Sequence, residues 1–335
     1  MASGDVLTIN GDDVQVLLDG REQEILAAAA AAYKAHGRGQ SSLPHSLFLR
    51  FPEDERNRII ALPAYLGDGF SIAGVKWISS FPGNLEQGLN RASAVIILNS
   101  AETGRPQAIM EGSLVSAKRT AASAALAASQ LTARPPRAVG IIGCGPINLE
   151  VTRFLLAVWP ELRSFHIFDV DAERAQQFKQ KCEQLQVEAE VVPELTAVLS
   201  KAELVSFATT AGTPHVFSLS QCIPGSTILH VSLRDLAPEV ILSSDNVVDD
   251  VAHVNRAQTS IHLAEQLTGN TDFIRCTLAE VLEGTATPKK DPDALTIFSP
   301  FGLGVLDLAV AQLVMELASE DGRGTLLKNF LPSSN

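Results

Sequence analysis

The chain has 335 residues, of which 46% are hydrophobic and 19% charged, and its formal net charge is −12. This length predicts about two domains, and this composition excludes a disordered or fibrous chain. The negative charge argues against nucleic acid or an anionic membrane as a partner, because both carry charge of the same sign.

Nothing in the sequence indicates export, membrane insertion or a metal site. No apolar run is long enough to span a membrane, and the N-terminus lacks the basic and then apolar pattern of a signal peptide. The cysteines are widely scattered and show no metal-ligand spacing: Cys144, Cys182, Cys222 and Cys276. We therefore expect a cytoplasmic protein without a metal.

The first third of the chain predicts helices followed by strands. Residues 5–37 read as helical, with an alanine run at 27–32 and Gly37 as a stop. Short apolar runs separated by glycine, proline and asparagine then predict antiparallel strands at Phe48–Arg50, Arg58–Pro63, Ile72–Trp77, Ala94–Asn99 and Gln107–Met110. A long alanine-rich helix at 114–131 leads into the second domain.

From Arg137 onward, apolar runs alternate with helical segments, as a doubly wound parallel sheet requires. The predicted strands are Val139–Ile142, Ser164–Asp169, Ala189–Val192, Leu204–Ala208, Thr227–Val231, Asn246–Val248 and Leu295–Phe298. The final helix, 305–318, resembles the N-terminal helices in composition. We therefore expect it to return to the first domain.

A glycine turn after the first of these strands predicts a dinucleotide site. Gly143 permits a tight turn, and Gly145 lets the backbone approach a pyrophosphate. Pro146 and Ile147 open a helix whose first amide groups would face the phosphate charge. Asn148 replaces the third glycine of the usual pattern, so we expect helix and strand to lie slightly farther apart.

Asp169 ends the next apolar run, 165–168, at the place where dinucleotide-binding proteins carry an acidic residue. Its carboxylate can accept hydrogen bonds from ribose hydroxyls and would repel a 2′-phosphate. The sequence therefore predicts NAD rather than NADP as the cofactor.

Three further residues could carry chemistry. Lys76 follows a strand-like run, where it is either a functional cation or a solvated one. Arg119 interrupts a helix of small apolar residues and needs an anionic partner, which could be a ligand or a structural salt bridge. Asp235 follows a predicted strand of the parallel sheet, where ligands bind, although a turn or capping aspartate would fit the same place.

Together these features resemble the ornithine cyclodeaminase/μ-crystallin family, over nearly the whole chain and with similar spacing. The matching segments are Lys76 with Pro82 and Asn84, Gly88-Leu89, Thr103–Pro106, Arg119 with Thr120, the glycine turn, Asp235, and 302–307. The resemblance implies an α/β fold with two parts. A dimerisation and substrate domain at 1–118 and 305–335, completed by the C-terminal helix, would accompany a Rossmann-type NAD-binding domain at 119–304, with the active site in the cleft.

The resemblance also implies roles for individual residues. Arg50, Lys76 and Arg119 match the family's substrate-carboxylate clamp, and Phe301 falls where the family touches substrate. Asp235 matches the catalytic acid/base, and Lys76 could also act on the proton of the substrate nitrogen. The expected cofactor contacts, besides the glycine turn, are Thr120, Asp169, Thr209 and Ser232. Family members are generally homodimers that act on small amino acids.

Departures from the cyclodeaminase pattern favour another branch of the family. Arg91 stands where cyclodeaminases usually have threonine, and Glu239 stands where a cofactor-touching lysine is expected. The segments 74–78, 90–99 and 142–145 most resemble the branch that oxidatively hydrolyses N-(2-amino-2-carboxyethyl)-L-glutamate with NAD, giving 2,3-diaminopropionate and 2-oxoglutarate for siderophores or peptide natural products. That substrate carries three carboxylates, which Arg91, and also Arg58 or Arg234, could help to bind.

Two alternatives remain at this point. Another enzyme of the family, such as an ornithine or lysine cyclodeaminase or an alanine dehydrogenase-like imine reductase, would use the same residues. A non-catalytic NAD(P)-dependent binder of small molecules, of the μ-crystallin type, would not need Lys76, Arg119 and Asp235 together.

Overall fold

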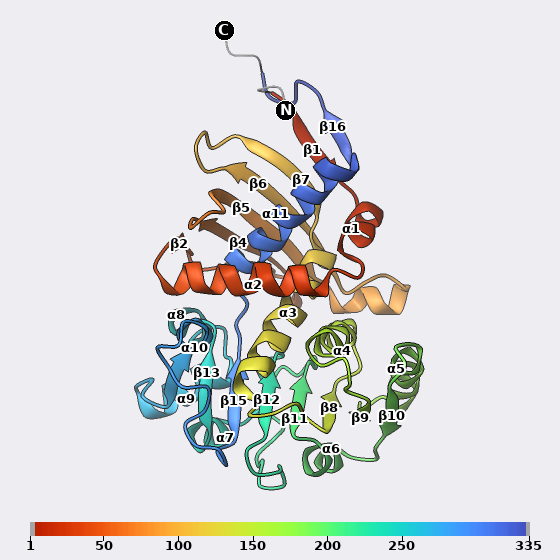
Figure 1. Cartoon of the computed structure of the whole chain (residues 1–335), viewed down its shortest axis with the longest axis vertical. Helices are drawn as coiled ribbons and strands as arrows, with labels where there is room; N and C mark the ends of the chain where they lie inside the picture. The colour runs from red at the N-terminus through yellow and green to blue at the C-terminus, as the bar shows by residue number, and fades with distance from the viewer. Residues whose placement is uncertain (1–3, 333–335) are drawn as a thin grey trace. The chain divides into compact units, whose positions relative to one another are not determined.

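The computed structural model describes residues 4–332, which form two compact units (Figure 1). The first unit contains the chain up to Arg119 and again from Leu303, and the second contains Thr120–Gly302. Helix α3, Ser113–Leu131, passes from one unit into the next. The first and last described residues therefore belong to the same unit.

The first unit is built on one mixed sheet with strand order β16-β1-β7-β6-β5-β4-β2, to which β3 adds by pairing with β4 (Figure 1). Its strands are β1 Val6–Ile9, β2 Ser41–Ser42, β3 Leu47–Phe51, β4 Asp54–Leu66, β5 Ile72–Ser80, β6 Ala92–Ser100, β7 Pro106–Glu111 and β16 Thr325–Leu327. Its helices besides α3 are α1 Gly11–Leu18, α2 Glu22–Gly37, the 3-10 helix η1 Pro82–Gln87 and α11 Gly304–Asp321. All five predicted strands are present.

The prediction of a wholly helical segment at 5–37 is wrong at its beginning. Val6–Ile9 form β1, which pairs in parallel with β7 and antiparallel with β16. Four residues are too few to reveal a strand period, and both partners lie far away in the sequence. The short strand β16 was not predicted, for the same reason.

Helix α11 packs on one face of this sheet, against β4, β5 and β6, and also against α2 (Figure 1). The covered face carries Leu66, Ile72, Ile96 and Leu98, all of which are buried. Lys76 lies on the same face, directly opposite Leu62 and Ile96 in the neighbouring strands. It is therefore in the middle of β5, not at a strand end as the sequence suggested.

The second unit is a parallel sheet with the order β10-β9-β8-β11-β12-β15-β13-β14. Its strands are β8 Ala138–Ile142, β9 Ser164–Phe168, β10 Glu188–Val191, β11 Leu204–Phe207, β12 Thr227–His230, β13 Asp245–Val248, β14 Ile274–Thr277 and β15 Thr296–Ser299. Its helices are α4 Pro146–Val158, α5 Ala172–Gln184, α6 Leu195–Lys201, α7 Pro238–Leu242, α8 Val251–Val254, α9 Ser260–Thr268 and α10 Leu278–Leu282. This is the predicted doubly wound sheet.

One strand of this sheet, β14, was missed by the sequence prediction. Its sequence, Ile274-Arg-Cys-Thr277, is short and half polar, so it shows no strand pattern. Pairing with β13 decides its conformation, and Thr277 then caps α10 through a reciprocal bond with Glu280.

Candidate active site

The glycine turn connects β8 to α4 in the second unit. Gly143 has a positive φ of 90°, and a Cβ atom there would lie 2.6 Å from the carbonyl oxygen of Ala208. Only glycine fits this position. A Cβ on Gly145, by contrast, would meet nothing within 4 Å, so there is open space beside the backbone where a pyrophosphate would approach.

The first turn of α4 leaves backbone amide groups for a phosphate. Gly145 is the N-cap residue and has no side chain to occupy them, and Pro146 follows it. The buried Asn148 donates hydrogen bonds to the carbonyls of Ile142 at 3.0 Å and Gly143 at 2.7 Å, and accepts one from Ser206 at 2.7 Å. Asn148 thus holds the turn, and the turn fits a dinucleotide.

Asp169 follows β9 and is joined to the turn. Its carboxylate accepts hydrogen bonds from the backbone amides of Cys144 at 2.7 Å and Asp171 at 2.9 Å. Each oxygen keeps lone pairs for a ribose hydroxyl. Burial, followed by the charge of Asp169, raises the pKa of the neighbouring Cys144 thiol to about 12, so this cysteine stays protonated and is not a nucleophile.

A buried cluster in the first unit joins two cations to one carboxylate. The Lys76 ammonium lies 2.8 Å from Oδ2 of Asp307, as an ion pair without hydrogen-bond geometry, and it donates to Ser116 at 3.0 Å. Arg119 donates through Nε to Oδ1 of the same carboxylate at 2.8 Å. The side chain of Lys76 is only 2% exposed and that of Asp307 is fully buried.

This cluster has an unbalanced charge. Two cations minus one carboxylate leave one positive charge in a buried place, and a buried charge requires a counter-ion. Within the described residues, the contact of Arg119 uses Nε, so both terminal amino groups of the guanidinium can bind an anion side by side. The predicted structural salt bridge therefore exists, but it does not use the two terminal amino groups of Arg119.

Burial and the charge of Arg119 lower the pKa of Lys76 to about 8, against the opposing effect of Asp307. The lysine can thus change its protonation state close to neutral pH, as a residue active in proton transfer must. An anion bound to the cluster would favour its charged form.

Asp235 lies in the loop after β12 of the second unit and is fully buried. The hydroxyls of Thr209 and Ser232 donate to its two oxygens, one to each. Nε2 of His230 is 3.3 Å from one carboxylate oxygen, and Nε2 of His215 is 3.6 Å from the other. Asp235 does not cap a helix, because the N-cap residue of α7 is Ala237.

The surroundings of Asp235 favour its ionised form. Although burial acts to raise the pKa of Asp235, the neighbouring His230 and the hydroxyls of Ser232 and Thr209 together lower it below its ordinary value. The ionised carboxylate is the form that can accept a proton.

The structure brings only part of the predicted site residues together. Thr209 and Ser232 meet at Asp235, and Lys76 and Arg119 meet at Asp307. The exposed Arg50 lies with its guanidinium 5.8 Å from the ring of Phe48 and is not part of the Lys76 cluster. Thr120 is half-buried on α3, and Arg234 donates to the carbonyl of Ala257 at 2.7 Å.

Arg91 precedes β6 and is half-buried. Burial lowers its pKa, and among the described residues no acidic group pairs with its guanidinium. Phe301, after β15, is fixed by the buried Asp249, whose carboxylate accepts from the amides of Phe301 at 2.9 Å and Gly302 at 2.7 Å. Burial raises the pKa of Asp249.

Sequence reasoning missed four residues of these clusters. Asp307 could have been found as the lone acid in the first turns of an otherwise apolar helix, and Asp249 as an acid that follows a predicted strand. His230 ends a buried strand and His215 lies in a loop. Neither histidine belongs to a motif, so only the fold shows that they flank Asp235.

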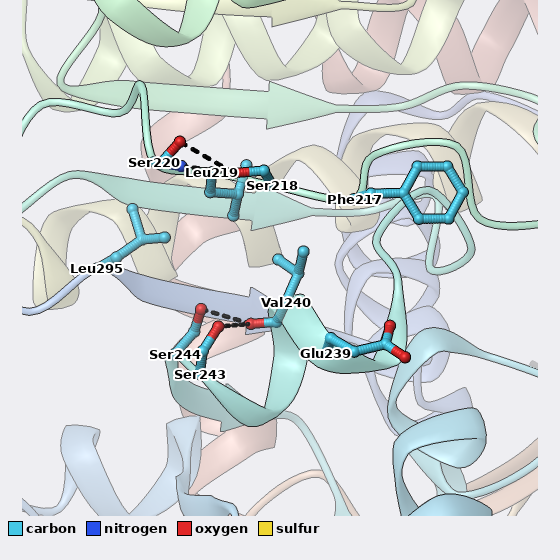
Figure 2. A pocket seen from close by; sticks show the side chains of 9 residues that line it. All are labelled: Phe217, Ser218, Leu219, Ser220, Glu239, Val240, Ser243, Ser244 and Leu295. Carbon is cyan, nitrogen blue, oxygen red and sulfur yellow. Dashed lines mark hydrogen bonds between the residues drawn. The ribbon is translucent and has the colours of Figure 1, made fainter.

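A cavity of about 410 Å³ lies elsewhere in the second unit, beside the residues that precede β12, β13 and β15 (Figure 2). The hydroxyls of Ser243 and Ser244 that line it donate to the carbonyl of Val240, at 3.1 and 2.7 Å. Its acidic group is Glu239, whose exposed side chain appears at the rim. Its lining shares no residue with the clusters above, so we assign it no part in the chemistry.

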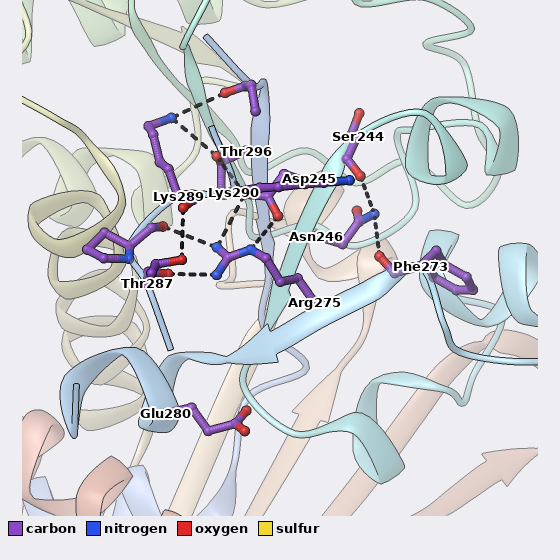
Figure 3. Close-up of polar contacts among 12 residues, drawn as sticks. Ser244, Asp245, Asn246, Phe273, Arg275, Glu280, Thr287, Lys289, Lys290 and Thr296 are labelled. Carbon is purple, nitrogen blue, oxygen red and sulfur yellow. Dashed lines mark hydrogen bonds and ion pairs between the residues drawn. The ribbon is translucent and has the colours of Figure 1, made fainter. Parts of the chain in front are cut away.

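A polar network at the beginning of β13 ties neighbouring strands together (Figure 3). Asp245 accepts from Nε of Arg275 in β14 at 2.6 Å and from Thr296 in β15 at 3.1 Å. Lys289 in turn donates to Thr296 at 3.2 Å and to the carbonyl of Gly225 at 2.9 Å. Since these donors and acceptors satisfy one another, the network serves stability.

Across residues 4–332, no helix is long and apolar enough to cross a membrane. The same residues contain no group of three or more His, Cys, Asp or Glu side chains that could hold a metal ion.

Two curated relatives match nearly end to end. The chain is 28% identical to the N-((2S)-2-amino-2-carboxyethyl)-L-glutamate dehydrogenase of Staphylococcus aureus, over 97% of this chain and 99% of that protein. It is 27% identical to the alanine dehydrogenase of Archaeoglobus fulgidus, again over 97% of this chain and 99% of the relative.

Two solved structures of other proteins have a similar fold over nearly the whole chain. The Δ1-pyrroline-2-carboxylate reductase of Thermococcus litoralis, in complex with NADH and L-proline, matches with a TM-score of 0.89 and 26% identity, covering 96% of this chain and 99% of that one. An archaeal alanine dehydrogenase dimer with bound NAD matches with a TM-score of 0.86 and 28% identity, covering 97% and 99%.

These findings confirm the predicted fold class, the NAD cofactor and the enzymatic nature of the protein. The chain is an NAD-dependent enzyme that acts on carbon–nitrogen bonds of amino acids. The sequence model of the ornithine cyclodeaminase/mu-crystallin family matches residues 12–322, so the chain belongs to that family.

Proposed function

We propose that the protein oxidatively hydrolyses N-(2-amino-2-carboxyethyl)-L-glutamate to 2,3-diaminopropionate and 2-oxoglutarate. The main observation is the excess of positive charge: the Lys76–Arg119–Asp307 cluster carries one net charge, and Arg91 is half-buried without an acidic partner among the described residues. A substrate with three carboxylates can place one at each of these two sites. The similarity to the S. aureus dehydrogenase supports the same substrate.

In this proposal each cationic group binds a carboxylate. The paired terminal groups of Arg119 and the ammonium of Lys76 hold the α-carboxylate of the glutamyl part, while Asp307 keeps both cations in place. Arg91 binds a second carboxylate, which ornithine, lysine and alanine lack. Arg50 and Phe301 also contact the substrate, and Thr120, Thr209 and Ser232 contribute to the cofactor site.

The glycine turn, the first amides of α4 and Asp169 hold NAD⁺, which supplies the hydride acceptor for the glutamyl Cα. Asp235 accepts the proton of the secondary amine, because His230 and the hydroxyls of Ser232 and Thr209 keep it ionised. Asp235 gives up this first proton before the next step. When hydride transfer has turned the carbon–nitrogen bond into an iminium, the Asp235 carboxylate takes a proton from the attacking water and returns it to the leaving nitrogen. Lys76 assists by orienting the carboxylate next to this bond.

The proposal is tested by the products. The purified protein, NAD⁺ and the glutamyl-diaminopropionate adduct should give NADH, 2-oxoglutarate and 2,3-diaminopropionate in equal amounts, measured by absorbance and mass spectrometry. Parallel reactions contain ornithine, lysine, alanine or proline. Production of proline from ornithine without net NADH would instead identify a cyclodeaminase, and turnover of alanine or proline alone would identify a simple dehydrogenase.

We predict that Asp169→Ser relaxes the cofactor preference. The wild type should prefer NAD⁺ clearly, because the carboxylate repels a 2′-phosphate, and a hydroxyl would remove that repulsion. Serine also keeps an acceptor for the amide of Cys144, which now binds the carboxylate at 2.7 Å. Steady-state kcat/KM for both cofactors measures the effect. Equal wild-type values for NAD⁺ and NADP⁺ would refute the role of Asp169.

The pKa of Lys76 predicts a pH dependence of substrate binding. Below a pH of about 8 its ammonium is charged and attracts a carboxylate, and above it the cluster loses one positive charge. We therefore expect kcat/KM, which reports the free enzyme, to fall as the pH rises through that value. In Lys76→Met this decrease with rising pH should disappear, and kcat/KM should be low at every pH. If the variant shows the same decrease, the titration belongs to another group.

We also propose that the protein is a homodimer. The sheet face of the first unit opposite α11 exposes four large apolar side chains: Leu47 at 70%, Leu49 at 48%, Trp77 at 41% and Tyr65 at 38%. They share that face because Leu47 pairs with Ala61, which pairs with Trp77, and Leu49 pairs with Ile59. Exposed apolar side chains gathered on one sheet face favour burial in an interface, and a second copy of the chain provides one.

Sedimentation at micromolar concentration should give about twice the monomer mass of 35.7 kDa. Leu47→Glu places a charge on this sheet face and should shift the protein to the monomer. Leu267→Glu, at an exposed site on α9 of the second unit, is the matched control and should remain a dimer. A wild-type monomer would rule out the dimer.

A further inference from the structure

We infer that His215 carries protons between Asp235 and solvent; this inference rests on the proposed function and deepens it. The reaction releases one net proton per turnover. A protonated secondary amine, NAD⁺ and water give a ketone, a protonated primary amine, NADH and H⁺, so that both atoms and charges balance. Asp235, as the acid/base, must dispose of that proton in every cycle.

Asp235 cannot do this directly, because its side chain is fully buried. The hydroxyls of Thr209 and Ser232 occupy both of its oxygens, but a hydroxyl does not store a proton near neutral pH. His230 is equally buried, and its other ring nitrogen lies 3.3 Å from Ser299. A proton held by His230 would therefore remain inside the protein.

His215 combines contact with Asp235 and exposure. Its Nε2 atom is 3.6 Å from Oδ1 of Asp235, while 43% of its side chain is exposed. That separation is slightly longer than a hydrogen bond, so the transfer requires the two groups to approach each other or one water to lie between them. Histidine is also the side chain whose ordinary titration lies nearest to neutral pH.

The backbone holds His215 at this place. The amides of His215 and Val216 both donate to the carbonyl of Asp235 at 2.9 Å, and the amide of Ala237 donates back to Val216 at 2.9 Å. Val216 and Leu236 thus form an isolated parallel bridge. Two loops after neighbouring strands are fastened together at the two residues that exchange the proton.

The proton path has two steps. The carboxylic acid of Asp235 gives its proton to Nε2 of His215, so that Asp235 is again a carboxylate and His215 an imidazolium. The imidazolium then releases one proton to water. His215 acts through Asp235 and is a relay residue without a substrate contact of its own.

The test compares His215→Gln and His215→Ala with the wild type under saturating adduct and NAD⁺. Removing the relay should lower kcat by about tenfold or more and leave KM nearly unchanged. Adding imidazole should restore the rate of His215→Ala, since the lost side chain opens to solvent, but it should not restore Asp235→Asn. His166→Gln is the matched control, because His166 also pairs with a carboxylate, Glu190, at 2.9 Å on the same sheet.

A double variant separates a relay from a merely structural role. If His215 works through Asp235, His215→Gln should cost nothing more in an Asp235→Asn background. Three results would overturn the inference. The first is a normal kcat in both His215→Gln and His215→Ala, and the second is a loss in His215→Ala alone that imidazole does not rescue. The third is a double variant in which the losses of His215→Gln and Asp235→Asn are fully additive. If the wild type turns over only another amino acid of the panel, the proposed substrate is wrong, and the same variants test the relay with that amino acid.

Discussion

Asp235→Asn is expected to reduce kcat by about a hundredfold or more, the usual scale for the loss of a general acid/base. The KM for the adduct should change little, because the proposed carboxylate contacts belong to Lys76 and Arg119. The fold should survive. Hydroxyl groups both donate and accept, so Thr209 and Ser232 can rotate to bind an asparagine amide in place of the carboxylate.

Steady-state kinetics and NAD⁺ binding by titration calorimetry measure this effect separately from folding. Asp245→Asn is the matched control, since Asp245 is also a buried carboxylate of the second unit but belongs to the network with Arg275. It should lower Tm and leave kcat of the folded protein near the wild-type value. Near-normal turnover by Asp235→Asn with NAD⁺ bound would reduce Asp235 to a loop-fastening residue, and Lys76 would become the first candidate base.

The cofactor half of the protein could be predicted from the sequence because its signals are local. The strand before Gly143, the turn itself and Asp169 follow one another within about thirty residues, as a βαβ unit demands. Likewise, the buried strands of the parallel sheet are short apolar runs bounded by breaks. Only β14, half polar and four residues long, escaped this pattern.

The first unit was less predictable because distant segments complete it. β1 is a strand only through its pairing with β7 and β16, which come from the middle and the end of the chain. Lys76 was recognisable as an unusual residue, but its burial depends on α11, which covers the middle of β5. The sequence predicted that this helix returns to the first domain, but not that it covers Lys76.

The side-chain partners in the two charge clusters also could not be predicted from the sequence. Arg119 was predicted to need an anion, and the structure supplies Asp307, a residue that no spacing rule connects to it. Asp235 was predicted as a functional acid, whereas its contact with His215 arises where two loops are joined by backbone bonds. The residue type in the sequence indicates that a charge needs a partner, but only the fold determines which residue that partner is.

Arg119→Ala is expected to raise the KM for the adduct by about a hundredfold or more, with a smaller effect on kcat. Two charge-assisted hydrogen bonds to the substrate carboxylate would be lost, each contributing about 1.5–3 kcal/mol. The cluster would also lose its excess charge, because the remaining Lys76 and Asp307 neutralise each other. The KM of Arg119→Lys should lie between those of the wild type and Arg119→Ala, since lysine keeps the charge but cannot present two parallel donors.

Binding of 2-oxoglutarate and of its mono-ester in the presence of NADH, by calorimetry, isolates this contact from the chemical steps. If Arg119 holds the carboxylate next to the reacting carbon, Arg119→Ala should bind 2-oxoglutarate much more weakly than the wild type does. The ester blocked at that carboxylate should bind to the variant about as weakly as it binds to the wild type. Arg323→Ala, which breaks an exposed pair with Asp13 in the same unit, should leave both affinities unchanged. An Arg119→Ala variant that binds 2-oxoglutarate as tightly as the wild type would leave Arg119 with the structural bond to Asp307 alone, and the excess charge of the cluster would then have to be balanced by another ligand.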